Sequence, residues 1–243
     1  MKTRLDQALV QRGLAESREK AQRLILAGEV RVAGQIATKA GHQIPDDAEV
    51  AVTQAERFVS RGGEKLEAAF KAFALDVTGK VCVDIGASTG GFTDCLLQHG
   101  AARVYAVDVG RGQLHWRLHA DPRIVVMDGV NARYLRSGDL PEPPAMVTVD
   151  AAFISLTLLL PAVKELLLPG GEIVTLIKPQ FEAGRAEVGK GGVVRDERIR
   201  RQVIERVHMF GERTLGLLWR GLCESPLHGP AGNVEFLAYW NKP

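Results

Sequence analysis

The stretch that decides the fold is residues 81–92, with the sequence VCVDIGASTGGF. Its first half carries the β-branched residues Val81, Val83 and Ile85 between two glycines, which is typical of a short strand buried on both faces of a sheet. Glycines after the strand permit a sharp turn, and residues 92–99 then have the pattern of a helix that stops at Gly100. Such a corner leaves backbone N–H groups at the helix start free to bind a ligand. We therefore expect a cofactor to bind here.

Acidic residues at three successive strand ends indicate which cofactor this is. The glycine spacing differs from the dinucleotide fingerprint, which disfavours a pyrophosphate. Asp84 ends the first strand, Asp108 ends a second strand over residues 103–109, and Asp128 follows a third over residues 124–127. Asp84 would lie near an amino-acid moiety, Asp108 would accept from two ribose hydroxyls, and Asp128 would accept from an adenine amino group. We expect S-adenosylmethionine, with an ordinary turn and solvated acids as the alternative. The expected cofactor-binding residues are Asp84, Gly86, Ser88, Thr89, Gly90, Gly91, Asp108 and Asp128.

Composition is that of an ordinary globular protein. With 243 residues, 46% hydrophobic and 25% charged, the chain can form one sizeable core and a small extra domain. Its net charge of +2 permits a nucleic-acid partner without requiring one. Three cysteines without metal-ligand spacing indicate reduced core residues, no metal site and a cytoplasmic location. The most apolar run, residues 156–163, is too short to span a bilayer, so we expect no membrane partner.

Residues 1–55 predict a small α/β module with a basic face. Two short helices end at Gly13 and Gly28, and a strand near residues 30–32 leads into a polar hairpin. Acidic residues are interspersed, so a solvated surface is an open alternative to a binding face. The candidate binding residues on this face are Arg4, Arg18, Lys20, Arg23 and Arg31.

Residues 62–243, after a linker at 56–61, predict a larger domain. Further strands are expected at residues 146–150 and 172–178, and two closing segments, 215–223 and 234–240, suit an antiparallel pair. Strands that alternate with helices predict an α/β fold with a Rossmann-like sheet, parallel with a terminal antiparallel strand.

Two charged residues stand at the carboxyl ends of the fourth and fifth strands, where open α/β sheets bind ligands. These are Asp150 and Lys178. A lysine that closes an apolar strand is costly to desolvate, which indicates a catalytic role or, alternatively, a structural ion pair with Asp150. Lys65 near the start of a helix and Glu235 at the start of the last strand complete a candidate catalytic set.

Several motifs together resemble a known family. Residues 4–34 resemble the S4 RNA-binding domain, although Ala33 stands where Asn is common. Lys65, Asp150, Lys178 and Glu235 fall in the order of the Lys-Asp-Lys-Glu tetrad of FtsJ-like RNA ribose 2′-O-methyltransferases. With SRGGEKL at residues 60–66 and KGGVVRD at residues 190–196, nearly the whole chain resembles the TlyA family, historically called haemolysins. The resemblance implies a class I methyltransferase sheet, and transfer of a methyl group from S-adenosylmethionine to the 2′-hydroxyl of a cytidine in ribosomal RNA. The implied partner is ribosomal RNA or a ribosomal subunit, and the five basic residues of the S4-like module are then expected to bind RNA.

The chemistry of this reaction explains the residue types. A ribose hydroxyl is a poor nucleophile, so its oxygen must lose a proton during in-line attack on the sulfonium methyl. Lys178 is expected to be the base or the group that orients the hydroxyl, and Lys65 a second cation that favours its neutral form. Two other readings remain open, a membrane-lytic haemolysin and a non-catalytic RNA-binding factor on a methyltransferase-like scaffold.

Overall fold

The computed structural model describes residues 2–52 and 57–243, and the chain divides into two compact units, Met1–Arg57 and Phe58–Pro243. The linker expected at residues 56–61 begins at Glu56, which lies outside the described residues. From Phe58 onward the chain belongs to the larger unit, because the Phe58 ring is 3% exposed within its core and the Val59 N–H donates to Asp94 Oδ2.

The smaller unit is a mixed α/β module around its own apolar core. Ser17 caps the second of its helices by accepting from the Lys20 N–H. Leu5, Leu9, Ile25 and Ile44 are fully buried between the helices and two small sheets. The sheets have strand orders β1-β4 and β3-β2-β5. The elements are β1 (Lys2–Arg4), α1 (Leu5–Gln11), α2 (Arg18–Leu26), β2 (Val30–Val32), β3 (Gln35–Ile36), β4 (Gln43–Pro45) and β5 (Val50–Val52).

The larger unit is built on a seven-stranded sheet with the order β11-β12-β10-β9-β6-β7-β8. Five strands are parallel, and β12 runs antiparallel to both β10 and β11, which confirms the expected Rossmann-like sheet. The strands are β6 (Val81–Ile85), β7 (Arg103–Asp108), β8 (Ile124–Asp128), β9 (Met146–Val149), β10 (Glu172–Ile177), β11 (Leu218–Glu224) and β12 (Phe236–Asn241).

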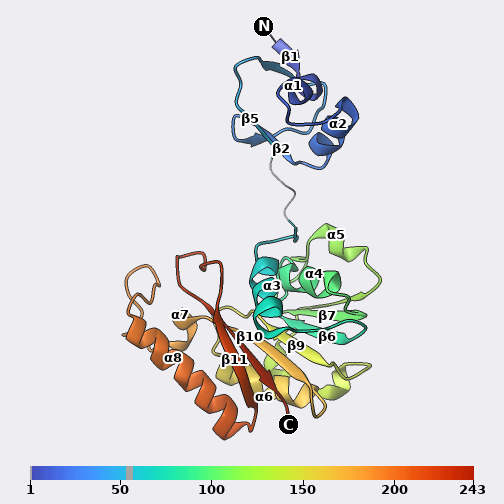
Figure 1. Cartoon of the computed structure of the whole chain (residues 1–243). Coiled ribbons are helices and arrows are strands. Elements are labelled where there is room, and N and C mark those ends of the chain that lie inside the picture. Colours follow the sequence, from blue (N-terminus) through green and yellow to red (C-terminus); the bar gives the residue numbers. More distant parts are fainter. Residues whose placement is uncertain (1, 53–56) are drawn as a thin grey trace. The chain divides into compact units, whose positions relative to one another are not determined.

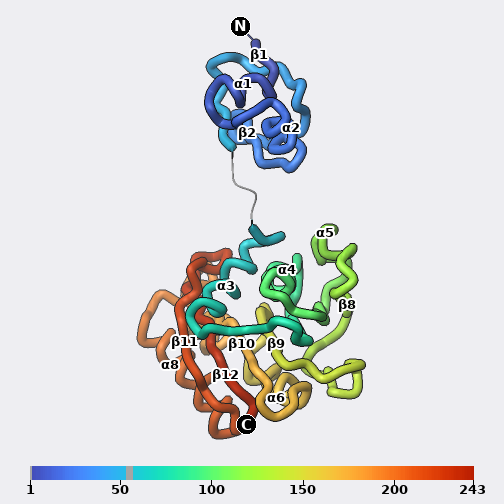
Figure 2. Tube along the Cα trace, turned by 45° about the vertical axis from the view of Figure 1, so that its right-hand side comes forward, coloured from blue at the N-terminus to red at the C-terminus, as the bar shows by residue number. Residues whose placement is uncertain are grey.

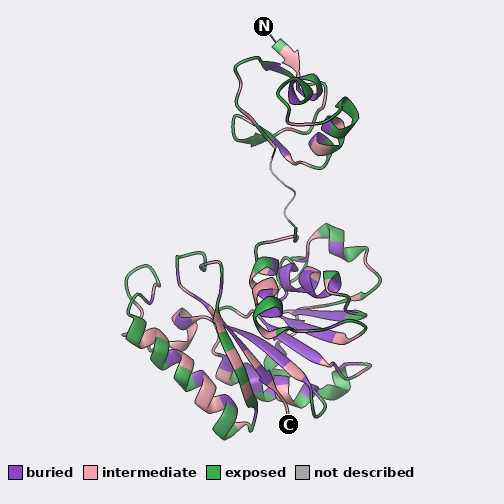
Figure 3. Cartoon of the chain, in the orientation of Figure 1, coloured by how far each residue is buried: buried purple, intermediate pink, exposed green. Residues whose placement is uncertain are grey.

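Helices cover both faces of this sheet, and β11 and β8 lie at its opposite ends (Figures 1 and 2). Alternate strand residues face two separate cores, so Cys82 packs with α3 and α4 while Val83 and Ile85 pack with α6. Figure 3 shows the central strands β6, β7, β9 and β10 largely buried between these layers. The helices are α3 (Gly62–Phe73), α4 (Gly91–Gln98), α5 (Trp116–His119), α6 (Leu156–Leu166), α7 (Pro179–Glu182) and α8 (Glu197–Met209), with short helical turns η1 (Ala132–Tyr134), η2 (Ser137–Asp139) and η3 (Phe210–Thr214).

The strand order reverses between β6 and β9, because the chain moves outward from β6 to β8 and returns to the other side of β6. Ligands of open α/β sheets bind at the carboxyl ends of the strands at such a reversal. Here these ends carry the glycine-rich loop after β6 and Asp150 after β9.

Candidate active site

The glycine-rich loop packs directly against the end of β9. Gly86 has φ +82°, and a Cβ atom there would lie 2.5 Å from the Asp150 carbonyl oxygen. Only glycine fits this turn, so the loop and Asp150 are held in close contact. At the other end of the loop, a Cβ on Gly91 would collide with Ser60 Oγ, which lets the start of α4 lie against the start of α3.

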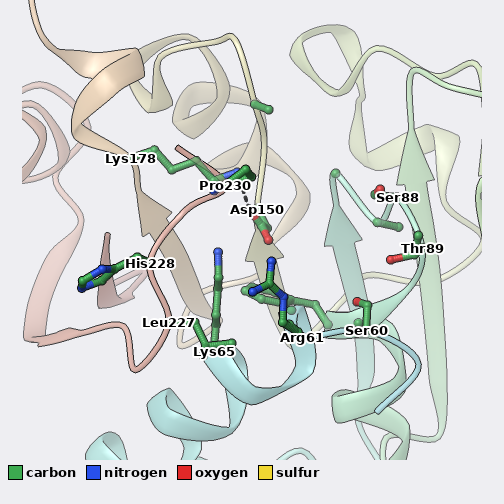
Figure 4. Close-up of a pocket in the computed structure, with 16 residues that line it drawn as sticks. Ser60, Arg61, Lys65, Ser88, Thr89, Asp150, Lys178, Leu227, His228 and Pro230 are labelled. Atoms are coloured by element: carbon green, nitrogen blue, oxygen red, sulfur yellow. Dashed lines mark ion pairs between the residues drawn. The ribbon is translucent and has the colours of Figure 1, made fainter. Parts of the chain in front are cut away.

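Two adjoining cavities open at this edge of the sheet. The first has a volume of about 330 Å³ and includes the side chains of Lys65, Asp150 and Lys178 in its wall (Figure 4). The second, of about 430 Å³, is lined by apolar residues such as Ile85 and Leu159 together with Asp108 and Asn131. Gly86, Ser88, Asp150 and Ala152 line both, so the cavities meet at the glycine-rich loop.

Two lysine–carboxylate ion pairs bring together the four residues of the expected catalytic set. Lys178 Nζ lies 2.6 Å from Asp150 Oδ1, in a direction that is not aligned as a hydrogen bond. Lys65 Nζ lies 2.6 Å from Glu235 Oε2 and donates a hydrogen bond to it. Both lysine side chains are 12% exposed, so each charge is largely removed from solvent but still reaches the first cavity.

Glu235 is buried behind Lys65 and lies just before β12 rather than within it. Its side chain is 1% exposed, and its second carboxylate oxygen accepts a hydrogen bond of 3.2 Å from Gln180 Nε2. Gln180 belongs to α7, two residues after Lys178, so the two ion pairs are joined through one short helix.

The three expected cofactor acids differ in where their side chains lie. Asp108 lines the second cavity, and its carboxylate accepts from the N–H groups of Ser88 at 2.8 Å and Gly110 at 2.7 Å. Asp84 is not among the residues that line either cavity. It is fully buried on the α4 side of β6 and accepts from Thr93 and Thr148. Burial raises the pKa of Asp84 to about 7, against the opposing effect of the hydroxyl hydrogen bonds.

Asp128 is also not part of the cavity lining. Its carboxylate instead accepts from the Gly112 N–H at 2.8 Å, and Asn131, three residues later, lines the second cavity. Among the loop residues, Gly86, Ser88, Thr89 and Gly91 line the first cavity. Gly90 does not, because its α-carbon faces the side chains of Leu114 and Leu118. These differences arise because side-chain direction depends on local turns that strand-end position alone does not fix.

The five residues expected to bind RNA fall into two groups. Arg4 and Arg18 both pair with the buried carboxylate of Asp6, at 3.0 and 2.9 Å, and the Arg4 hydrogen bond is the largest cause of the strongly lowered pKa of Asp6. Arg31 donates to the Gly34 carbonyl. Lys20 and Arg23 are exposed on α2, and neither forms an ion pair within residues 2–52 and 57–243.

Sequence reasoning missed several cavity residues. Phe153 is 90% exposed, has φ +62° and lines the second cavity, with its ring 5.0 Å from that of Phe181. Arg61 and His228 line the first cavity near Lys65 (Figure 4). Arg61 lies within the motif at residues 60–66 and could have been found, whereas neither Phe153 nor His228 carries a local sequence signal.

Comparison with known protein families shows which family has this chain as a member. The FtsJ-like methyltransferase family matches residues 58–242, which include both cavities and all four ion-pair residues. The chain belongs to the FtsJ-like methyltransferase family. An S4 domain matches residues 3–50, so both expected components are confirmed for this family member.

Relatives that match the FtsJ-like chain over nearly its whole length combine both components. The 16S/23S rRNA (cytidine-2′-O)-methyltransferase TlyA of Mycobacterium tuberculosis is 46% identical over 98% of this chain and 89% of its own length. Hemolysin A of Brachyspira hyodysenteriae is 44% identical over 98% and 99% of the two chains. A solved Streptococcus thermophilus protein, described as a candidate hemolysin, is 45% identical with a TM-score of 0.76 and covers 99% of this chain and 88% of its own. The expected membership of the TlyA family is thereby confirmed.

Some relatives carry the name hemolysin, so the helices of this chain were compared with the requirements of a membrane span. Among residues 2–52 and 57–243, no helix combines the length and the apolar composition needed to cross a membrane.

Proposed function

We propose that this chain transfers a methyl group from S-adenosylmethionine to the 2′-hydroxyl of a cytidine in ribosomal RNA. The observation that carries the proposal is the pair of lysine–carboxylate contacts, Lys178–Asp150 and Lys65–Glu235, at the wall of one cavity beside the glycine-rich loop. Family membership gives methyl transfer, and the names of the TlyA relatives give the substrate class.

The second cavity has the chemistry that an adenosine group requires. Its apolar wall suits a purine ring, Asp108 offers carboxylate oxygens to ribose hydroxyls, and Asn131 offers a polar side chain to the base. Ser88, which lines both cavities, lies where an adenosine in the second cavity would continue into the first. When bound, S-adenosylmethionine supplies a sulfonium methyl group. These residues support its use, with Asp108 as the principal polar contact.

The first cavity has the groups that an unactivated hydroxyl requires. We assign Lys178 to contact the attacking 2′-oxygen, to orient it and to accept its proton. Asp150 holds the Lys178 amine in place, and Glu235, fixed by Gln180, does the same for Lys65. Lys178 accepts the proton as the neutral amine, and the positive charge of Lys65 stabilises the negative charge that develops on the oxygen.

The RNA substrate is bound by both units in this proposal. Residues 1–55 act as the S4-like RNA-binding domain and residues 62–243 as the catalytic domain, and of the expected linker 56–61 the part from Phe58 onward packs with the larger unit. Lys20 and Arg23 present exposed charges for phosphate contacts, while exposed Phe153 offers an aromatic face to a base beside the cavities.

The decisive experiment compares two lysine substitutions that break similar ion pairs. Lys178→Ala should reduce transfer of labelled methyl groups to separated ribosomal subunits by at least about 100-fold, because a positioned proton acceptor contributes that much to such a step. Lys80→Ala is the matched control, because Lys80 Nζ lies 2.7 Å from Glu172 Oε2 at the amino ends of the strands, away from both cavities.

Calorimetry with S-adenosylmethionine completes this test. Both variants should retain the dissociation constant of the wild type, and mapping of 2′-O-methyl positions should locate the product on a cytidine. Normal turnover by Lys178→Ala would refute the catalytic assignment. RNA binding by the wild type without methyl transfer would refute the proposed reaction.

A further inference from the structure

A mixed cluster of metal-binding side chains lies between α3 and α4, outside both cavities. It consists of Glu67 on α3, Cys95 on α4 and His99 directly after α4. A carboxylate oxygen, the cysteine sulfur and a ring nitrogen all lie within 4.8 Å of one another. His99 is the residue that caps the end of α4, four residues after Cys95, so both side chains project from the same side of this helix.

The cluster is partly pre-organised. His99 Nε2 lies 2.7 Å from Glu67 Oε2, and the imidazole stacks on Phe70 with ring centroids 3.9 Å apart and an interplanar angle of 12°. Cys95 is fully buried, while the side chains of His99 and Glu67 are 28% and 12% exposed. The sulfur therefore lies on the inner side of the cluster and solvent can reach the outer side.

The donor set fits a borderline-soft divalent cation. Thiolate, imidazole and carboxylate are the three ligand types that zinc takes from proteins, with a water completing a tetrahedron. Ligand bond lengths near 2.1 Å require the nitrogen and oxygen to stand about 3.4 Å apart, so the His99–Glu67 contact has to open by only about 0.7 Å. Lys71 Nζ lies 3.3 Å from Glu67 Oε1, whereas His99 contacts Oε2, so the lysine and the imidazole approach different carboxylate oxygens.

We propose that Glu67, Cys95 and His99 form a structural Zn²⁺ site that fastens α3 to α4. Coordination converts the Cys95 thiol to a thiolate and releases its proton to solvent, so affinity rises with pH. Glu67 follows Lys65 by two residues and points to another side of α3, so the metal takes no part in methyl transfer. Its effect is to join the helix that carries Lys65 to the helix that follows the glycine-rich loop.

The test uses the untagged full chain, stripped of metal with a chelator and titrated with Co²⁺ and Zn²⁺. The wild type should bind one equivalent of Co²⁺ with the charge-transfer absorption of a thiolate–cobalt bond, and Zn²⁺ should displace it. Cys95→Ser should abolish this absorption and weaken Zn²⁺ binding at least about tenfold. Cys223→Ser, which alters a half-buried thiol on β11, is the matched control and should change neither.

A second variant protects the test against a folding defect at the buried Cys95. His99→Gln alters a partly exposed residue and should also weaken Zn²⁺ binding at least about tenfold, with an unchanged circular dichroism spectrum. Zinc should raise the melting temperature of the wild type and not that of either variant. Absence of saturable binding, or a thiolate–cobalt absorption that persists in Cys95→Ser, would overturn the proposal and leave an ordinary His99–Glu67 hydrogen bond.

Discussion

At the scale of single residues, Asp84 is a carboxyl group with no exposed surface at the centre of the sheet. Its two oxygens accept from Thr93 Oγ1 at 2.7 Å and Thr148 Oγ1 at 3.0 Å. Because burial raises its pKa to about 7, while an unfolded aspartate titrates near pH 3.9, folding takes up a proton at this residue between these pH values.

This proton uptake predicts how stability changes with pH. Between about pH 4 and pH 7 the folded state binds more protons than the unfolded state, so Asp84 lowers the free energy of unfolding as pH rises. The whole effect is on the order of 4 kcal/mol. Asp84→Asn lacks this titration, so its stability relative to the wild type should improve from pH 5 to pH 8.

Urea unfolding followed by tryptophan fluorescence measures this effect, because all three tryptophans, Trp116, Trp219 and Trp240, lie in the larger unit. Glu197→Gln, on the exposed face of α8, is the control and should keep the pH dependence of the wild type. Curves for Asp84→Asn that run parallel to those of the wild type would show that Asp84 does not titrate in this range.

Residue-level prediction from sequence succeeded where strand-end position decides the geometry. Lys178 and Asp150 follow neighbouring parallel strands, so their proximity could be expected, and the sequence pattern alone left open whether they form a catalytic or a structural pair. Strand-end position alone does not give the direction of an acidic side chain. Strand alternation turns Asp84 toward α4, and the carboxylate of Asp128 accepts from the Gly112 N–H, from a loop 16 residues earlier.

At the scale of elements, α7 follows Lys178 at the end of β10 and contacts the segment that follows Asp150 at the end of β9. Glu182 at the end of α7 accepts from the Leu156 N–H at 2.7 Å and from Ser155 Oγ at 2.6 Å, both at the start of α6. The segment after Lys178 is thereby tied to the segment after Asp150. Burial is the main cause of the raised pKa of Glu182.

We expect this tie to be required for turnover rather than for cofactor binding. Glu182→Ala should lower kcat for methyl transfer at least about tenfold, since a displacement near 1 Å has large effects on a positioned reaction, and should leave the KM for S-adenosylmethionine unchanged. Glu182→Gln keeps the acceptor for the Leu156 N–H and should restore most of kcat. Equal activity of the two variants would contradict a positioning role.

Element boundaries predicted from sequence agree with the structure to within a few residues, with one instructive difference. The charged stretch from about residue 195 to residue 212 predicts one helix, but the structure ends it as α8 at Met209, and η3 (Phe210–Thr214) continues as a wider π-helical turn. Gly211 in this turn packs under the indole of Trp240, where a Cβ atom would collide with the ring. A contact with the last strand therefore sets this helix end, and no local pattern in the sequence encodes it.

At the scale of the whole molecule, the exposed charges proposed to contact RNA and the two cavities proposed to hold the cofactor and the acceptor hydroxyl lie in different units. Arg4 and Arg18 help to hold Asp6 in the S4 core, whereas Lys20 and Arg23 have exposed charges. Replacing both Lys20 and Arg23 with Gln should weaken binding to ribosomal RNA about tenfold and reduce the slope of log K against log salt by about 1.5, because two phosphate contacts are lost.

Filter binding across a range of salt concentrations measures this loss, and calorimetry should give an unchanged dissociation constant for S-adenosylmethionine. The control removes the same charge from the larger unit by replacing Arg201 and Arg213 with Gln, both of which are exposed. A salt dependence equally reduced in the control would point to nonspecific attraction. An unchanged affinity in the Lys20 and Arg23 variant would exclude these residues from the RNA contact.

The close approach of Gly86 to the Asp150 carbonyl has a consequence for how such a protein can change over time. A methyl group at position 86 would push on the backbone that presents Asp150, so the loop proposed to bind the methyl donor and the carboxylate proposed to hold Lys178 share one close contact. Evolutionary change in either one at this contact would therefore disturb the other.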